Sequence, residues 1–156
     1  MAFRTIADPT VRDALVRRLR GLTPDARRRW GTLTPHEMLC HLGDATAMVL
    51  GDRPRRVPVV TGRRRLARAL GLWSPLRWPH GVPTNPRHDP RAEGTRPSTF
   101  DADRARAIDG IVRLASARAL DAQLEATHGI FGPMSTRDWQ RWTFKHTDHH
   151  LRQFGL

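Results

Sequence analysis

Histidines carry most of the chemistry that this sequence offers, and three of them fall within five residues near the end of the chain. His146 and His150 are four residues apart, so a helix would place them on one face, with His149 at the flank of that face. Two imidazoles at this spacing can bind the same metal ion. Because two imidazoles are rarely enough for a stable site, a metal centre requires a third ligand from elsewhere in the chain.

The helix that carries these residues should begin after Ser135, a capping residue that is followed by an acidic residue, Asp138, in the first turn. Apolar and polar side chains then recur at helical spacing. The inner stripe predicted for this helix consists of Trp139, Trp142, Thr143, His146, His150 and Gln153. The two histidines therefore continue a line of two tryptophans on the buried face.

A second predicted helix supplies the candidate for the third ligand. Thr34 is an N-cap, Pro35 suits the first helical position, and Glu37 completes a capping box. The helix should run to about Leu50 and end at Gly51. Its apolar stripe is made of Met38, His41, Leu42, Ala45, Met48 and Val49. One histidine is thus expected on the core face, whereas the neighbouring cysteine is turned about 100° away from it.

Two further helices and a long connection complete the predicted fold. One helix should span residues 8 or 9 to about 20, and the other should begin at 99 or 101, end near 118 and bury Ile108, Ile111, Val112 and Ala115. Between residues 52 and 99 the chain is rich in proline, and only residues 63–73 have helical periodicity, which predicts a small helix held by Leu66, Leu70 and Trp73. We therefore predict an all-α single domain over residues 1–156. It is a four-helix bundle whose long crossover between helices two and three partly covers a site.

The composition narrows the classes of partner. The formal net charge is +12, which invites a nucleic-acid interpretation, but all but one of the 27 basic residues are arginines scattered along the chain. Coding that is rich in G and C produces this pattern without selecting a partner, so we predict no specific nucleic-acid site.

No apolar run approaches 18 residues and the N-terminal residues do not resemble a signal peptide, so we predict no membrane association. The lone Cys40 cannot form an internal disulfide, and we expect a cytoplasmic protein.

The histidines alone permit two interpretations. A buried imidazole needs partners for both nitrogens, so three on inner faces are costly unless one cation accepts a nitrogen from each. His41, His146 and His150 would then leave an open position for water or substrate, as catalytic sites do. In the other interpretation, His146 and His150 are half-exposed and free near a chain end. Five other histidines are expected at the surface or in unconstrained loops, namely His36, His80, His88, His128 and His149, and Cys40 is expected to be a small buried hydrophobe.

Three stretches resemble the DinB-like superfamily of bacterial four-helix bundles. They are residues 30–45, residues 131–135, and the segment from Trp139 through the final histidine pair to Gln153. The resemblance implies that one histidine of helix two and two histidines of helix four bind a divalent ion, usually zinc or nickel. By position these are His41, His146 and His150, and Gln153 matches a glutamine of that superfamily. Residues 52–99 match poorly.

The resemblance also implies a class of function. Relatives include transferases that use the low-molecular-weight thiols bacillithiol or mycothiol, and a thiol-dependent isomerase. A metal of this kind lowers the pKa of a bound thiol or water. The expectation is therefore a metal-dependent transferase or hydrolase with a small-molecule substrate, in which Asp44 is the candidate for orienting a ligand imidazole. The alternative is a non-enzymatic protein, either a metal-stabilised or basic binding module or a homodimer scaffold. No thiol-binding signature stands out in the sequence.

Overall fold

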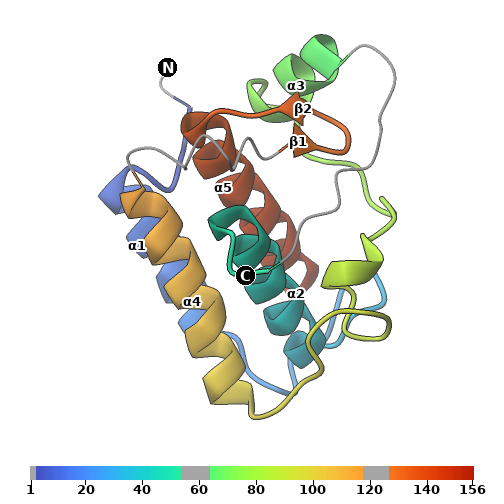
Figure 1. Ribbon diagram of the computed structural model, residues 1–156. Coiled ribbons are helices and arrows are strands. Elements are labelled where there is room, and N and C mark those ends of the chain that lie inside the picture. The colour runs from blue at the N-terminus through green and yellow to red at the C-terminus, as the bar shows by residue number, and fades with distance from the viewer. Residues whose placement is uncertain (1–2, 54–63, 118–126) are drawn as a thin grey trace.

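The structure of the protein is a computed structural model that describes residues 3–53, 64–117 and 127–156. These residues form five α-helices, one short 3-10 helix and one pair of antiparallel strands (Figure 1). In chain order the elements are α1 (Pro9–Arg20), α2 (Pro35–Leu50), α3 (Arg64–Leu72), η1 (Pro86–His88), α4 (Phe100–Ser116), β1 (Thr127–His128), β2 (Gly132–Pro133) and α5 (Thr136–Gln153). The predicted helical character is confirmed for these residues. Within the part of the chain described, no helix is both long and apolar enough to cross a membrane.

The helix starts predicted from capping residues are confirmed. The hydroxyl of Thr34 accepts a hydrogen bond from the Glu37 backbone N–H at 3.2 Å, and the Thr34 N–H donates to the Glu37 carboxylate at 2.8 Å. Ser135 and Asp138 repeat this reciprocal arrangement at the start of α5, with distances of 3.2 and 3.0 Å. At the other end of α2, Gly51 has a φ of 83°, a left-handed conformation that glycine adopts without strain. Both helices that carry the candidate ligands are therefore fixed at their N-termini by their own sequences.

Helix α2 lies at the centre of the fold. It packs most closely against α4 and also contacts α5, while α1 contacts both α4 and α5 (Figure 1). The approach of α2 to α4 requires a glycine, because a Cβ at Gly110 would lie only 2.1 Å from the hydroxyl oxygen of Thr46. These four helices contribute to one buried core that includes Leu15, Leu19, Met38, Leu42, Ile111, Leu114, Trp139 and Leu151. A four-helix bundle in the strict sense stays a prediction.

The chain between α2 and α4 contains α3 and η1, and two details of the prediction for this region need correction. Leu66 and Leu70 do not hold α3 in place, because they are 50 and 53 % exposed; Leu72 is the fully buried residue of this helix. The predicted first residue of α3, at position 63, lies outside the described residues. The helix is thus attached through its C-terminal end, close to α5 and β2.

The buried face of α4 is also rotated relative to the prediction. Ile111 is fully buried as expected, but Val112 is 41 % exposed. The face that enters the core instead includes Ala107, Gly110 and Leu114. Apolar periodicity could not reveal this because the close contact at Gly110 sets the rotation of the helix, and a glycine contributes nothing to an apolar stripe. The predicted end of the helix near residue 118 lies beyond the residues that the structure describes.

Candidate metal centre

Three imidazole rings from α2 and α5 converge on one point. The Nε2 atom of His146 lies 2.9 Å from Nε2 of His41 and 3.2 Å from Nε2 of His150. One ligand nitrogen from each ring lies within 4.8 Å of the other two. The spacing of four residues on α5 and the position of His41 on the core face of α2 produce this arrangement, as the sequence predicts. His41 and His150 are buried, and His146 is half-buried.

The outer nitrogens of two of these rings are held by oxygen acceptors. Nδ1 of His41 lies 2.9 Å from the backbone carbonyl oxygen of His88, and Nδ1 of His150 lies 2.8 Å from the side-chain oxygen of Gln153. These oxygens only accept hydrogen bonds, so both Nδ1 atoms must carry the hydrogen. In a neutral ring the Nε2 atom then presents a lone pair, and both lone pairs face the third ring.

This arrangement cannot be satisfied by hydrogen bonds alone. Nε2 of His146 can donate one hydrogen at most, whereas two lone pairs, from His41 and His150, lie within hydrogen-bond distance of it. At least one of the two contacts therefore brings lone pairs together without a hydrogen between them. A cation at the shared point would accept a lone pair from every ring, so the donor set fits a metal ion bound by three neutral nitrogens.

Burial keeps these rings in the form that binds metals. Desolvation lowers the pKa of His41 and lowers the pKa of His146 and His150 well below the ordinary value. The neighbouring imidazoles add to the effect on His146, because each charged ring would repel the others. The three rings are therefore neutral at pH 7, so an ion does not have to compete with a charged imidazolium.

Aromatic side chains border the half-buried ring. The Trp142 indole stacks on His146 with ring centroids 4.4 Å apart and 25° between the planes, and Trp78 approaches the same ring with a centroid distance of 6.2 Å. Trp78 belongs to the crossover, so this part of the crossover lies beside His146, and its role as a cover over a site stays a prediction. The side chain of Lys145 helps to hold this part of the crossover there by donating to the backbone carbonyl of Leu76 at 2.8 Å.

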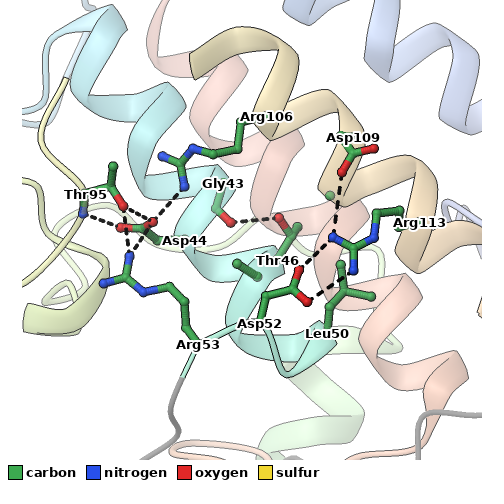
Figure 2. A pocket seen from close by; sticks show the side chains of 12 residues that line it. Gly43, Asp44, Thr46, Leu50, Asp52, Arg53, Thr95, Arg106, Asp109 and Arg113 are labelled. Carbon is green, nitrogen blue, oxygen red and sulfur yellow. Dashed lines mark hydrogen bonds and ion pairs between the residues drawn. The ribbon is translucent and has the colours of Figure 1, made fainter. Parts of the chain in front are cut away.

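Asp44 does not touch a ligand imidazole, contrary to its expected role. This fully buried carboxylate accepts hydrogen bonds from the backbone N–H and the hydroxyl of Thr95, each at 2.7 Å, and forms ion pairs with Arg53 and Arg106 at 2.5 and 2.9 Å (Figure 2). Burial would raise the pKa of Asp44, but these donors hold it below its ordinary value. The contact with Thr95 joins the chain that follows η1 to α2, and this chain segment also carries His88.

The same residues border a surface pocket of about 360 Å³ between α2 and α4, which Figure 2 shows. On its far side Arg113 pairs with Asp52 at 2.7 Å and with Asp109 at 3.7 Å. Its charged groups are therefore paired with one another, and the three converging histidines do not line it. The candidate centre and this pocket are separate features.

Sequence reasoning missed the roles of the loop histidines. His88 is buried and supplies the carbonyl that orients His41, while His128 accepts hydrogen bonds from the backbone N–H groups of Ile130 and Phe131 at 3.1 and 3.3 Å. His149 is half-buried rather than free, and its ring lies 5.4 Å from that of His150. The available signal for His88 was the pair of prolines at positions 86 and 90, which favours a rigid turn.

Comparison with known proteins gives a family but no function. A family model described as "Protein of unknown function (DUF1569)" matches residues 10–155. No curated protein and no solved structure gives a significant match to the chain.

Proposed function

The chain belongs to the DUF1569 family, whose description assigns no activity, and we propose that it is a metal-dependent enzyme in which His41, His146 and His150 bind one divalent ion. Zinc and nickel are the preferred candidates, because both are bound well by imidazole. We further propose that α1, α2, α4 and α5 form a four-helix bundle of the DinB-like kind. The family model matches nearly the whole chain, which supports the proposal that these helices form a single domain.

A single observation carries the proposal, namely the meeting of three Nε2 atoms at a point where hydrogen bonds cannot satisfy them all. Each alternative arrangement leaves a buried nitrogen unpaired, which costs on the order of 1 to 3 kcal/mol. The acceptors at His88 and Gln153 support the proposal further. Ligand imidazoles in metal sites almost always donate their second N–H to such a group, which fixes the ring orientation.

The number and charge of the ligands favour catalysis over a purely structural site. Three protein ligands leave a fourth position open, and three neutral ligands leave the full charge of the ion uncompensated. When bound, such an ion would act as a Lewis acid that lowers the pKa of a thiol or water and so provides a nucleophile at neutral pH. The side chains of Trp78 and Trp142 would exclude bulk water from this position. We therefore propose a thiol-dependent transferase or a metal-assisted hydrolase acting on a small molecule.

The experiment that tests this proposal combines metal analysis with ligand exchange. Untagged protein is loaded with cobalt(II) as a spectroscopic substitute for zinc, and metal is counted in wild-type protein, in His150→Ala and in a control, His80→Ala. We expect His150→Ala to bind one equivalent less than the other two proteins. Equal cobalt contents in all three proteins would contradict the proposed site.

Exogenous ligands then separate an enzyme from a metal-stabilised scaffold. Azide or a small thiol should change the visible spectrum of the wild-type cobalt protein, because each can occupy the open position. In His150→Ala the corresponding spectral change should be lost. If the wild-type ion is bound but its spectrum does not respond, the site is closed and the non-enzymatic alternative holds.

A further inference from the structure

A second cluster of metal-binding side chains lies between α2 and α4. It consists of His36 and Cys40, four residues apart on α2, and Asp103 on α4. One ligand atom from each residue lies within 4.8 Å of the other two, and Nε2 of His36 is 2.9 Å from Oδ2 of Asp103. Among the described residues, only this group and the three histidines have such geometry.

The two clusters use different faces of the same helix. Cys40 and His41 are adjacent in the chain, so their side chains point about 100° apart around α2. His41 therefore faces α5, and Cys40, which is fully buried, lies beside Asp103 of α4. No residue is shared between the clusters, and the second one is independent of the function proposed above.

The surroundings of Asp103 resemble those of a ligating carboxylate. Its Oδ2 atom accepts hydrogen bonds from the backbone N–H and the hydroxyl of Ser98, at 2.8 and 3.2 Å. These bonds fix the rotamer of the carboxylate, as the outer partners of metal ligands do. The ring of His36 contacts Phe100 with a centroid distance of 5.4 Å, which restricts that ring as well. Two of the three ligands are therefore held in place before any ion arrives.

Charge balance also favours a divalent ion here. Once an ion has displaced the thiol proton to solvent, the Cys40 thiolate and the Asp103 carboxylate together carry two negative charges, which match the charge of one divalent cation. Nearby, the Nε atom of Arg106 is buried, has no hydrogen-bond partner among the described residues, and lies 3.8 Å from Oδ1 of Asp103. The Arg106 guanidinium favours the thiolate, but burial and the Asp103 carboxylate outweigh it and raise the pKa of the Cys40 thiol to about 12, so an ion that binds here must displace the thiol proton. The two terminal nitrogens of Arg106 are engaged by Asp44 and by the backbone carbonyl of Cys40.

We propose that His36, Cys40 and Asp103 form a second metal site, selective for a thiophilic divalent ion such as zinc. The ligand set of one nitrogen, one sulfur and one oxygen matches the donors that zinc takes in proteins. His36 is the most exposed of the three, with a side chain 25 % accessible, so a fourth ligand would enter beside it. Bound metal would tie α2 to α4 near their N-terminal ends.

The competing explanation is a hydrogen-bonded triad without metal, in which the imidazole and the thiol both donate to Asp103. Cobalt(II) distinguishes the two, because a thiolate bound to cobalt gives an intense near-ultraviolet charge-transfer band that nitrogen ligands do not produce. Cys40 is the only cysteine in the chain, so the band has a single source. The measurement is made on the whole chain under reducing conditions, with the cobalt content counted in parallel.

Four proteins complete the test. Wild-type protein and the double variant His146→Ala/His150→Ala should both show the band, and the double variant should retain one equivalent of cobalt. Cys40→Ser should lose the band together with one equivalent, and Asp103→Asn should bind cobalt at this site at least tenfold more weakly. A wild-type protein without the band, whether or not it binds cobalt, would establish the hydrogen-bonded triad and overturn the proposal. His41, His146 and His150 contain no sulfur, so the absence of this band would not affect the function proposed above.

Discussion

At the residue scale, the orientation of the His41 and His150 rings depends on the oxygen acceptor at the second nitrogen of each ring. Gln153 accepts from Nδ1 of His150, and we expect Gln153→Ala to lower metal affinity by about 10- to 100-fold, because that ring would lose its fixed orientation. Gln153→Glu is the matched control, since a carboxylate accepts the same hydrogen bond and should retain the affinity. Competition with a chromophoric chelator measures both variants. Equal affinities for Ala and Glu would mean that the glutamine does not orient the ring.

His128 gives a pH-dependent prediction at the same scale. Burial lowers the pKa of His128 to about 4, whereas an unfolded chain titrates near its ordinary value of about 6.5. The unfolded state therefore binds more protons between these values, so the contribution of this residue to stability is complete above pH 6.5 and is lost as the pH falls toward 4. By pH 5 the loss should be about 2 kcal/mol.

Urea unfolding between pH 4 and pH 8 measures this effect. The free energy of unfolding of His128→Gln should fall less steeply below pH 6.5 than that of the wild-type protein, because glutamine does not titrate. Parallel pH profiles for the two proteins would show that His128 is not the group responsible.

Individual residues of the site differ in how far the sequence predicts them. His146 and His150 follow from helical spacing, and His41 follows from its place on an apolar stripe, so all three were accessible to periodicity. Periodicity could not predict the contact of the His88 carbonyl with His41. Any residue has a backbone carbonyl, and only the path of the loop brings this one to the ring. Cys40 and Asp103 lie 63 positions apart in the sequence, and no local pattern links residues that distant.

At the scale of elements, the buried carboxylate of Asp44 connects α2, α4 and the segment after η1 (Figure 2). Removing its charge leaves Arg53 and Arg106 without their shared partner. We expect Asp44→Asn to destabilise the protein by about 1 to 3 kcal/mol, because both arginines lose a charged acceptor but are partly exposed to water. The matched control is Asp52→Asn, which breaks an ion pair to Arg113 that is nearly half exposed and should cost less than about 1 kcal/mol.

Denaturant unfolding and metal binding together test this role. Asp44→Asn should also weaken metal binding at the three histidines, because the segment that carries the His88 carbonyl would be less firmly attached. If both substitutions cost the same free energy, or if metal affinity is unchanged in Asp44→Asn, the carboxylate does not position this segment.

The close contact between α2 and α4 at Gly110 predicts that a larger residue there destabilises the protein. Gly110→Ala would push a Cβ into the hydroxyl of Thr46, and we expect a net loss of about 1 to 3 kcal/mol despite the better helix propensity of alanine. Gly21→Ala is the control, because its nearest neighbouring atom would be 3.5 Å away and its φ of −79° suits any residue. Thermal unfolding compares the two. A Gly110→Ala protein as stable as wild type would contradict the close approach of these helices.

Local signals predicted the helices better than their faces. Caps at Thr34 and Ser135 give the start of each ligand-bearing helix because the pattern is confined to four residues. The rotation of α4 and the exposure of Leu66 and Leu70 depend on packing partners that are distant in the sequence. Apolar periodicity describes what a helix can bury, whereas its neighbours decide what it does bury.

At the scale of the whole molecule, the site depends on the meeting of segments separated by more than a hundred residues. His41 and His146 come from the second and the last helix, and the crossover contributes both Trp78 and the His88 carbonyl. The sequence predicts the long crossover from its prolines, but not which of its residues reach the site. A metal ion bound by His41, His146 and His150 should stabilise the whole fold, because only the folded chain brings these three rings together.

A crystal structure of the zinc-loaded protein, with anomalous data recorded on both sides of the zinc absorption edge, would show whether the three histidines bind one metal ion. We expect a zinc-specific anomalous peak between α2 and α5, at about 2.0 to 2.1 Å from the Nε2 atoms of His41, His146 and His150. We also expect that Nδ1 of His150 still donates to Gln153. A fully loaded crystal without a peak at this point, or with an ion bound by only one of the three rings, would contradict the proposed site.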